Sequence, residues 1–296
     1  MAAVSEARVP AAQGRIAGAF KTIGLFIRKQ PLGAFCALIV LAFIALAIFA
    51  PLLSPYDPEQ ASYEYQLTAP NAQFWFGTDD SGRDVFTRII YGARTALFVG
   101  FTCAFIGSFF GLILGVGSAY FGGKVDLIFQ RIIDVLMAFP LIIMALTIVA
   151  IFGSALQYVI LAITIPFIPK CARVVRSSAL AVREIPYIDA ARANGFSHSR
   201  IIMRHMVPNV MAPFLIMLTS FVGQAILLEA SLSFLGLGVQ DPTPAWGLML
   251  RNAQEYIREE YWLAVWPGLA ISLAVFAFSM FGDALRDALD PKLRQQ

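Results

Sequence analysis

Charged residues are scarce in this sequence. Only 14% of its 296 residues are Asp, Glu, Lys or Arg, whereas a soluble domain carries about a quarter. Apolar residues make up 58% of the chain, and the mean hydropathy is +0.71. Because so few charges cannot cover the surface of a protein of this size in water, the composition excludes an ordinary soluble protein and indicates a membrane protein.

Motifs of nucleotide-binding, metal-binding and hydrolytic proteins are also missing. The sequence has no G-x-x-x-x-G-K-[ST] phosphate loop, so we expect this chain not to bind ATP by itself. Its two His residues, His198 and His205, do not share a helix face, and no Cys/His cluster has metal-ligand spacing. The segment "DDSGRD" at 79–84 is similar to a calcium loop but lacks the acidic spacing and the distal Glu. We therefore expect no catalytic residue and no metal site.

Uncharged runs predict where the chain crosses a membrane, since a spanning helix needs ~20 apolar residues. These runs are 30–56, 95–123, 135–169, 206–228 and 261–282. The run 135–169 is too long for one helix and has a break signal at Gly153-Ser154, which predicts a hairpin of two helices. We expect six transmembrane helices in an all-α protein, at 33–53, 93–120, 130–152, 157–176, 209–233 and 263–283.

The distribution of Lys and Arg predicts the orientation of these helices. With both termini in the cytoplasm, the inner segments hold 17 basic residues and the outer segments hold five. This N-in, C-in arrangement follows the positive-inside rule. A cleaved signal peptide is the alternative for the first span, with "ALA" at 45–47 as the cleavage site. The polar segment of about 30 residues before the span favours an uncleaved anchor.

Small residues and prolines indicate how the spans pack and where they bend. Gly107, Gly111 and Gly115 recur every fourth residue and continue at Ala119, a ridge that predicts close packing of another helix. Prolines interrupt four spans and should bend or loosen them: Pro140, Pro166, Pro169, Pro213 and Pro267. The three cysteines, Cys36, Cys103 and Cys171, fall in or beside spans and are interpreted as small core residues.

Glu229 lies inside the predicted fifth span, five residues after Gln224. An ionised group deep in a membrane helix costs ~2.5–3.5 kcal/mol, so Glu229 should face protein or a water-filled path. Two interpretations stay open: Gln224 and Glu229 line a translocation path or gate, or Glu229 makes a structural hydrogen bond.

Two polar segments are expected on the outer side. The first, 54–92, contains "FGTDDSGRDVFTRIIYGARTAL", in which Val85 and Ile89 repeat at helical spacing and predict a short interfacial helix before the second span. The second is a Pro-rich turn followed by an amphipathic stretch, "LGVQDPTPAWGLMLRNAQEYIREEYW".

The inner stretch "EIPYIDAARANGFSHSRIIMRHMVPN" predicts two short helices. The first begins near Pro186, a favourable first position, and ends at Gly195 in a left-handed cap. The second begins after Ser197 or Ser199 and is broken near Pro208. The residues Tyr187, Ala190, Ala191 and Asn194 share one face of the first helix, and three of them are small or short. This pattern indicates a docking element; the alternative is a surface loop whose basic residues meet lipid phosphates.

Several motifs together resemble a known family. D-A-A-x-x-x-G at 189–195, with Pro208 thirteen residues after Gly195, is similar to the "EAA" loop of ABC importer permeases, although Asp189 replaces the usual Glu and His205 occupies a usually apolar position. The segments "FGTDDSGRDVFTRIIYGAR", "YFGGKVD", "EASLSFLGLGVQDPTPAWG" and "GDALRDALDPKLR" closely resemble the C-type permease of dipeptide, oligopeptide and nickel importers.

The resemblance implies a type I (MetI-like) permease bundle in a bacterial inner membrane, and it implies partners. These are a B-type permease, two ATPase subunits, a periplasmic substrate-binding protein and membrane lipid, with no nucleic acid. Tyr187, Asp189, Ala190, Ala191, Asn194 and Gly195 would then contact an ATPase subunit. No cofactor is expected in this chain, since ATP and Mg²⁺ would bind to the ATPase subunits. The expected divisions are a cytoplasmic segment 1–32, a first helix 33–53, a periplasmic segment 54–92, a permease core 93–285 with a coupling loop 184–208, and a tail 286–296.

The substrate stays open at this point. The resemblance implies di- or oligopeptides, with nickel chelates, glutathione and opines as alternatives handled by similar subunits. Two functions of other classes are also considered. An ion-driven secondary transporter would need more intramembrane carboxylates and an internal repeat. A non-transporting scaffold or sensor would not need the docking loop.

Overall fold

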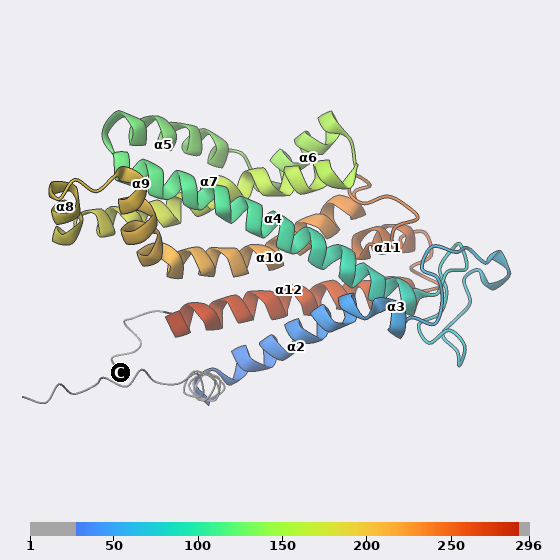
Figure 1. Ribbon diagram of the computed structural model, residues 1–296. Helices are drawn as coiled ribbons and strands as arrows, with labels where there is room; N and C mark the ends of the chain where they lie inside the picture. The colour runs from blue at the N-terminus through green and yellow to red at the C-terminus, as the bar shows by residue number, and fades with distance from the viewer. Residues whose placement is uncertain (1–27, 290–296) are drawn as a thin grey trace, which may run out of the picture.

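The computed structural model describes residues 28–289, and within this range all regular structure is helical (Figure 1). The predicted cytoplasmic segments 1–32 and 286–296 fall largely outside the described residues. The helices are α2 (Pro31–Ile48), α3 (Ala50–Leu53), η1 (Tyr63–Tyr65), α4 (Val85–Phe121), α5 (Gly123–Ala138), α6 (Leu141–Phe152), α7 (Leu156–Arg183), α8 (Pro186–Ala193), α9 (His198–Ile201), η2 (Ile202–Met206), η3 (Val207–Val210), α10 (Met211–Phe234), α11 (Trp246–Ala253) and α12 (Trp262–Leu289).

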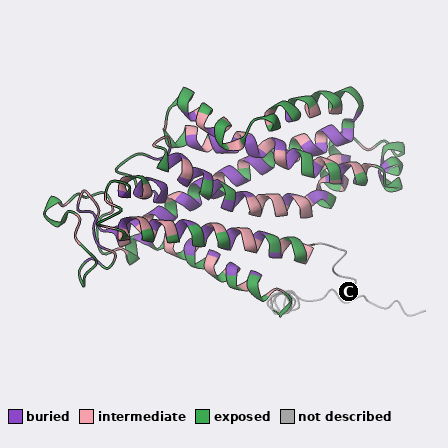
Figure 2. Ribbon diagram, turned by 180° about the vertical axis from the view of Figure 1, so that it is seen from behind, coloured by how far each residue is buried: buried purple, intermediate pink, exposed green. Residues whose placement is uncertain are grey.

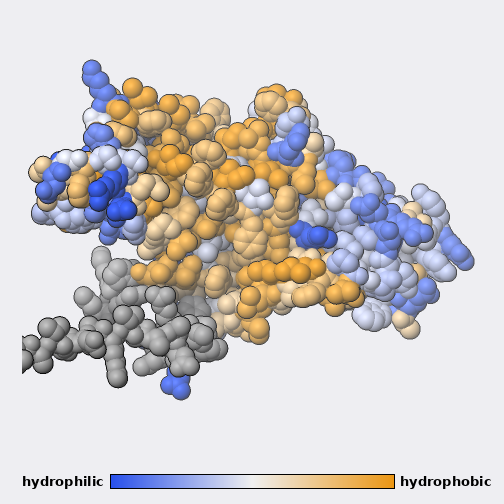
Figure 3. Space-filling view, in the orientation of Figure 1, coloured by the Kyte–Doolittle hydropathy of each residue, from blue (hydrophilic) through white to orange (hydrophobic). Residues whose placement is uncertain are grey.

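Long apolar helices form the body of the protein. Among residues 28–289, five stretches are long and apolar enough to cross a membrane, and the pair α5 and α6 supplies a sixth crossing if it counts as one broken span. The long helices run side by side along the length of the molecule (Figure 1). In Figure 3 the middle of the visible face is hydrophobic, while the ends that carry α8 and the residues before α4 are hydrophilic. This is the surface that a multi-pass membrane protein requires.

The third predicted span is not one straight helix, which corrects the expected helix at 130–152. It divides into α5 and α6, which are bent by 88° with respect to each other. The break lies at Phe139 and Pro140: Phe139 is extended, with φ −84° and ψ 133°. Proline disfavours the helical conformation in the residue before it and cannot donate a helix hydrogen bond, so α5 ends there. The predicted hairpin is present, because α6 ends at Phe152 and α7 begins at Leu156.

The second span is longer than predicted. The short helix expected before residue 93 is not a separate element: α4 is one helix of 37 residues that begins at Val85. Asp84 precedes it as the N-cap and accepts a hydrogen bond from the Thr87 N–H at 2.8 Å. The first turns of α4 are largely buried within this chain and belong to the same continuous helix as the second span. At 1.5 Å per residue, α4 is about 55 Å long.

The glycine ridge on α4 lies against α7. The glycines at 107, 111 and 115 each face α7 atoms, and a Cβ added at Gly115 would lie 2.7 Å from the Ala172 carbonyl oxygen. All three cysteines are free and buried, as predicted. Figure 2 shows buried residues along the long helices of the bundle, whereas α5 is exposed over most of its length and buries only Ile133.

Substituting Gly115 should destabilise the bundle. In Gly115→Ala the new methyl group meets backbone atoms of α7, which cannot move aside, so we expect a loss of ~1–3 kcal/mol, the usual cost of overpacking. Gly117→Ala is the matched control, since no atom lies within 4 Å of a Cβ at that position. Thermal unfolding of both variants in detergent would measure the difference. Equal stabilities would contradict the proposed close contact between α4 and α7.

Candidate functional site

The inner loop between α7 and α10 carries the residues that the sequence singles out. Its first helix, α8, has Pro186 at its start, as predicted. Gly195 has φ +74°, and two hydrogen bonds close the helix end: Gly195 N–H to Arg192 O at 2.9 Å and Phe196 N–H to Ala191 O at 3.1 Å. This is a Schellman arrangement, which needs a left-handed residue after the cap. Ser197 then caps α9 by accepting a hydrogen bond from the Arg200 N–H, also as predicted.

The face formed by Tyr187, Ala190, Ala191 and Asn194 does not point outward as a whole. Ala191 is only 7% exposed and packs in the core of this chain beside Ile188. The Tyr187 hydroxyl donates to the His205 carbonyl oxygen at 3.2 Å and accepts from the Asn209 amide at 3.0 Å. This corrects the sequence interpretation, since part of the small face attaches α8 to its own protein.

The rest of that face is exposed in this chain. Ala190 and Asn194 are exposed, and the Asn194 side-chain amide donates to the Ala190 carbonyl oxygen at 2.8 Å. The Asp189 side chain is 72% exposed and forms an ion pair with Arg192 at 3.1 Å. Of the six predicted coupling residues only Ala191 is buried, so a partner chain can reach Tyr187, Asp189, Ala190, Asn194 and Gly195.

Gln224 and Glu229 lie on the same helix, α10, but do not come together. Gln224 is exposed, whereas Glu229 is 2% exposed. The Ser233 hydroxyl donates to the Glu229 carboxylate at 2.7 Å and accepts from the Val239 N–H at 3.0 Å. Glu229 thus joins the end of α10, through Ser233, to the residues that follow it, and of the two residues only Gln224 is exposed in this chain.

We expect Glu229 to act through this hydrogen-bond chain. In Glu229→Ala the Ser233 hydroxyl loses its acceptor, and stability should fall by ~1–2 kcal/mol, the scale of a membrane hydrogen bond. Glu229→Gln keeps an acceptor and should change stability less. Ser231→Ala is the control, because Ser231 is half-buried and its hydroxyl donates to Leu227 O of the same helix. Thermal unfolding and uptake assays would decide: altered uptake at unchanged stability would instead assign Glu229 to the path.

A second polar cluster, which the sequence interpretation missed, lies at the outer end of α4. It consists of Asp79, Arg83, Arg88 and Asp241, and we call it the outer cluster. Arg83 contacts Asp79 at 2.7 Å and Asp241 at 3.0 Å, while Arg88 lies 3.6 Å and 3.5 Å from the same two carboxylates. These contacts join the segment before α4 to the segment between α10 and α11, which lie far apart in the sequence.

Arg88 is the most buried member of the outer cluster, with a side chain only 1% exposed. Its guanidinium donates to the carbonyl oxygens of Pro58 at 2.8 Å and Pro242 at 3.3 Å. The sequence indicates that Arg88 is paired, since an Arg next to an apolar span must find partners. The spacing could not name those partners, because they lie 30 and 154 residues away.

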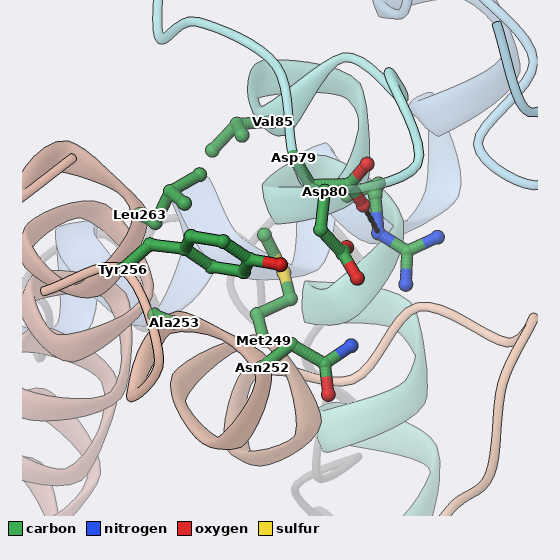
Figure 4. Close-up of a pocket in the computed structure, with 9 residues that line it drawn as sticks. Asp79, Asp80, Val85, Met249, Asn252, Ala253, Tyr256 and Leu263 are labelled. Atoms are coloured by element: carbon green, nitrogen blue, oxygen red, sulfur yellow. Dashed lines mark ion pairs between the residues drawn. The ribbon is translucent and has the colours of Figure 1, made fainter. Parts of the chain in front are cut away.

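A small cleft, partly open to solvent, adjoins the outer cluster between the residues before α4 and α11 (Figure 4). Asp80, Asn252 and Tyr256 line it with an apolar wall that includes Met249 and Leu263. Burial, together with the carboxylates of Asp79 and Asp241, raises the pKa of Asp80. Among residues 28–289 no group of three or more His, Cys, Asp or Glu side chains is placed to hold a metal ion. Within "DDSGRD", the Asp79 carboxylate accepts hydrogen bonds from the Ser81 and Arg83 N–H groups and forms an ion pair with the Arg83 side chain.

Asp134 of α5 forms an ion pair with Arg173 of α7 and lies 3.9 Å from Arg131 of its own helix.

Two family models match this chain. The model described as "Binding-protein-dependent transport system inner membrane component" matches residues 107–295. The model described as "N-terminal TM domain of oligopeptide transport permease C" matches residues 26–70. The first alone covers more than half of the chain, and it includes the inner loop and α10.

Curated proteins with related sequences are transport permeases. The chain is 44% identical, over 90% of its length and 88% of the relative, to the dipeptide transport system permease protein DppC of Alkalihalophilus pseudofirmus. It is 41% identical over 87% of both chains to a putative peptide transport system permease of Brucella abortus. It is 42% identical, over 90% of its length and 88% of the relative, to the glutathione transport system permease protein GsiD of Escherichia coli.

Solved structures show the same fold. A chain of the MetNI methionine ABC transporter in an inward-facing conformation aligns with 69% of this chain and 97% of its own length, at a TM-score of 0.56 and 20% sequence identity. A chain of an amino acid ABC transporter aligns with 71% of this chain and 95% of its own, at a TM-score of 0.51 and 16% identity. At these identities the likeness concerns the arrangement of the helices.

Proposed function

Because this chain belongs to the family of binding-protein-dependent inner-membrane permeases of ABC importers, we propose that it forms half of a translocation path for short peptides. The observation that carries the substrate class is the relationship to permeases of dipeptides and of glutathione, itself a tripeptide, at 42–44% identity over 90% of the chain. Nickel chelates and opines remain less supported alternatives. An ion-driven mechanism has no support from the family, whose members serve ABC importers.

The proposed partners follow from what the chain contains and lacks. It has no phosphate loop, so nucleotide and Mg²⁺ would bind to two ATPase subunits, and this chain would perform no hydrolysis. A B-type permease would supply the other half of the path, and a periplasmic binding protein would deliver the substrate. The exposed side of α8 would enter a cleft of one ATPase subunit.

The proposed cycle uses α8 as the moving contact. ATP would close the ATPase dimer, α8 would move with it, and the long helices would tilt to open the path outward. Hydrolysis would return the path to the inward-open state. In this scheme the present chain changes shape and binds partners, while chemistry takes place elsewhere.

Uptake into proteoliposomes tests this function. The complete transporter would be reconstituted with its binding protein, and labelled dipeptides, longer peptides, glutathione and a nickel chelate would be compared. We expect ATP-dependent uptake of peptides. Uptake driven by an ion gradient without ATPase subunits would contradict the proposal, and transport of the nickel chelate alone would overturn the substrate class.

A further inference from the structure

The inner end of α4 meets the coupling loop at one buried tyrosine. Tyr120 is 5% exposed, and its hydroxyl lies 2.7 Å from Nδ1 of His198, the first residue of α9. The Arg192 guanidinium, from the last turn of α8, lies over the Tyr120 ring at 5.3 Å from its centroid. Both short helices of the loop therefore contact the same α4 side chain.

This contact differs from the others that hold the loop. The loop is covalently continuous with α7 on one side and, through η2 and η3, with α10 on the other. Motion of α8 reaches those two spans along the backbone, and Tyr187 adds hydrogen bonds to the same η2 and η3 residues. The helix α4 has no such chain connection to the loop, so its movement with α8 and α9 depends on side-chain contacts.

Hydrogen bonds also hold the outer end of α4. Arg88 binds carbonyl oxygens of both outer segments, and the Trp246 indole N–H donates to Ile89 O at 2.9 Å. Between these ends, α4 packs along α7 through its glycines. A single helix of 37 residues thus reaches from the coupling loop to the outer cluster, and a long packed helix transmits displacement as a rigid element.

We propose that the Tyr120–His198 hydrogen bond, assisted by Arg192, couples movement of the loop to α4 and through it to the outer face. The inference rests on the proposed docking of α8 on an ATPase subunit. It assigns Tyr120 and His198 as positioning residues: they fix the loop against α4 and touch neither nucleotide nor substrate. Without the bond, α8 can still bind the ATPase, but its motion would no longer move α4 fully.

The test compares three variants in the reconstituted transporter. Tyr120→Phe removes the hydroxyl and keeps the ring under Arg192. His198→Ala removes the partner, while His198→Asn restores a polar atom near the position of Nδ1. Tyr158→Phe, at the outer start of α7, is the matched control for loss of a tyrosine hydroxyl. ATPase co-purification, ATP hydrolysis and peptide uptake are measured for each.

We expect Tyr120→Phe and His198→Ala to retain the ATPase subunits and to hydrolyse ATP, but to take up about tenfold less peptide per ATP, the equivalent of about 1.4 kcal/mol. His198→Asn should recover most of the loss. Wild-type uptake per ATP in both loss variants, or equal defects in His198→Asn and His198→Ala, would overturn the inference. Loss of ATPase binding in Tyr120→Phe would overturn it too, by making the contact part of docking. A wild-type complex that retains no ATPase would contradict the proposed function instead.

Discussion

Replacing Ala190 by tryptophan should abolish ATPase co-purification and peptide uptake while leaving the permease inserted and as stable as the wild type. Ala190 is exposed on α8, and no part of the described chain covers it. If the exposed side of α8 enters a cleft of an ATPase subunit, a large ring there must fail to fit, and overpacking of this kind costs ~1–3 kcal/mol or more. If the misfit costs about 2.8 kcal/mol of binding free energy, the affinity for the ATPase subunit falls about a hundredfold.

The variant Ala191→Trp separates docking from folding. Ala191 is buried in this chain, so a tryptophan at that position should displace α8 from the body, lower the melting temperature and expose the loop to protease. Both variants should lose uptake, but only Ala191→Trp should lose stability. A surface loop that merely contacts lipid makes the opposite prediction: Ala190→Trp would be mild, and neutralising Arg192, Arg200 and Arg204 would matter more. Full ATPase binding by Ala190→Trp would contradict the docking assignment.

Substitutions of Gly195 test whether the coupling loop needs the left-handed backbone conformation at this position. A Cβ at this position has nothing within 4 Å, so the only penalty for a side chain is the positive φ of 74°. Asn adopts this conformation with little cost, whereas a β-branched residue does not. We expect Gly195→Asn to couple almost normally and Gly195→Val to lose most uptake, as measured in the same proteoliposomes. Equal behaviour of the two variants would show that the Schellman arrangement is not needed.

Local signals explain which parts of the fold the sequence predicts. Pro186, Gly195 and Ser197 each act on a helix end within a few residues of themselves, and all three lie where their conformational preferences place them. Long uncharged runs predict the crossings because the membrane requirement is a property of each segment alone. The position of Pro140 predicts a bend, but its extent, 88°, depends on how α5 lies against the other helices.

Distant contacts explain what the sequence does not predict. The helix α4 begins eight residues earlier than expected because outer residues cover Arg88 and its neighbours, and these outer residues come from 30 and 154 positions away. Ala190 and Ala191 belong to the same face in the sequence pattern, yet Ala190 is exposed and Ala191 is buried against the rest of this chain. Periodicity describes a helix face but does not say which partner covers it.

Replacing Arg88 by alanine should release the outer segments from α4. The substitution removes donors from the carbonyl oxygens of Pro58 and Pro242 and one of the two cations from between Asp79 and Asp241. Breaking a buried ion pair by removing one partner costs ~3–5 kcal/mol, because the remaining groups stay buried without compensation. We expect a marked fall in melting temperature and rapid proteolysis within residues 54–84. Arg258→Ala, at an exposed outer position, should change neither property.

The conservative variant Arg88→Lys distinguishes charge from geometry at this site. The guanidinium of Arg88 reaches two carbonyl oxygens and lies between two carboxylates at once. A lysine ammonium is a single point of charge on a flexible chain and cannot occupy this planar, forked arrangement. We therefore expect Arg88→Lys to recover only a minor part of the stability lost in Arg88→Ala, and uptake to follow stability, because α4 would lose its attachment to the outer face. Full recovery by lysine would mean that positive charge alone holds the outer cluster together, and that the paired carbonyl contacts contribute little.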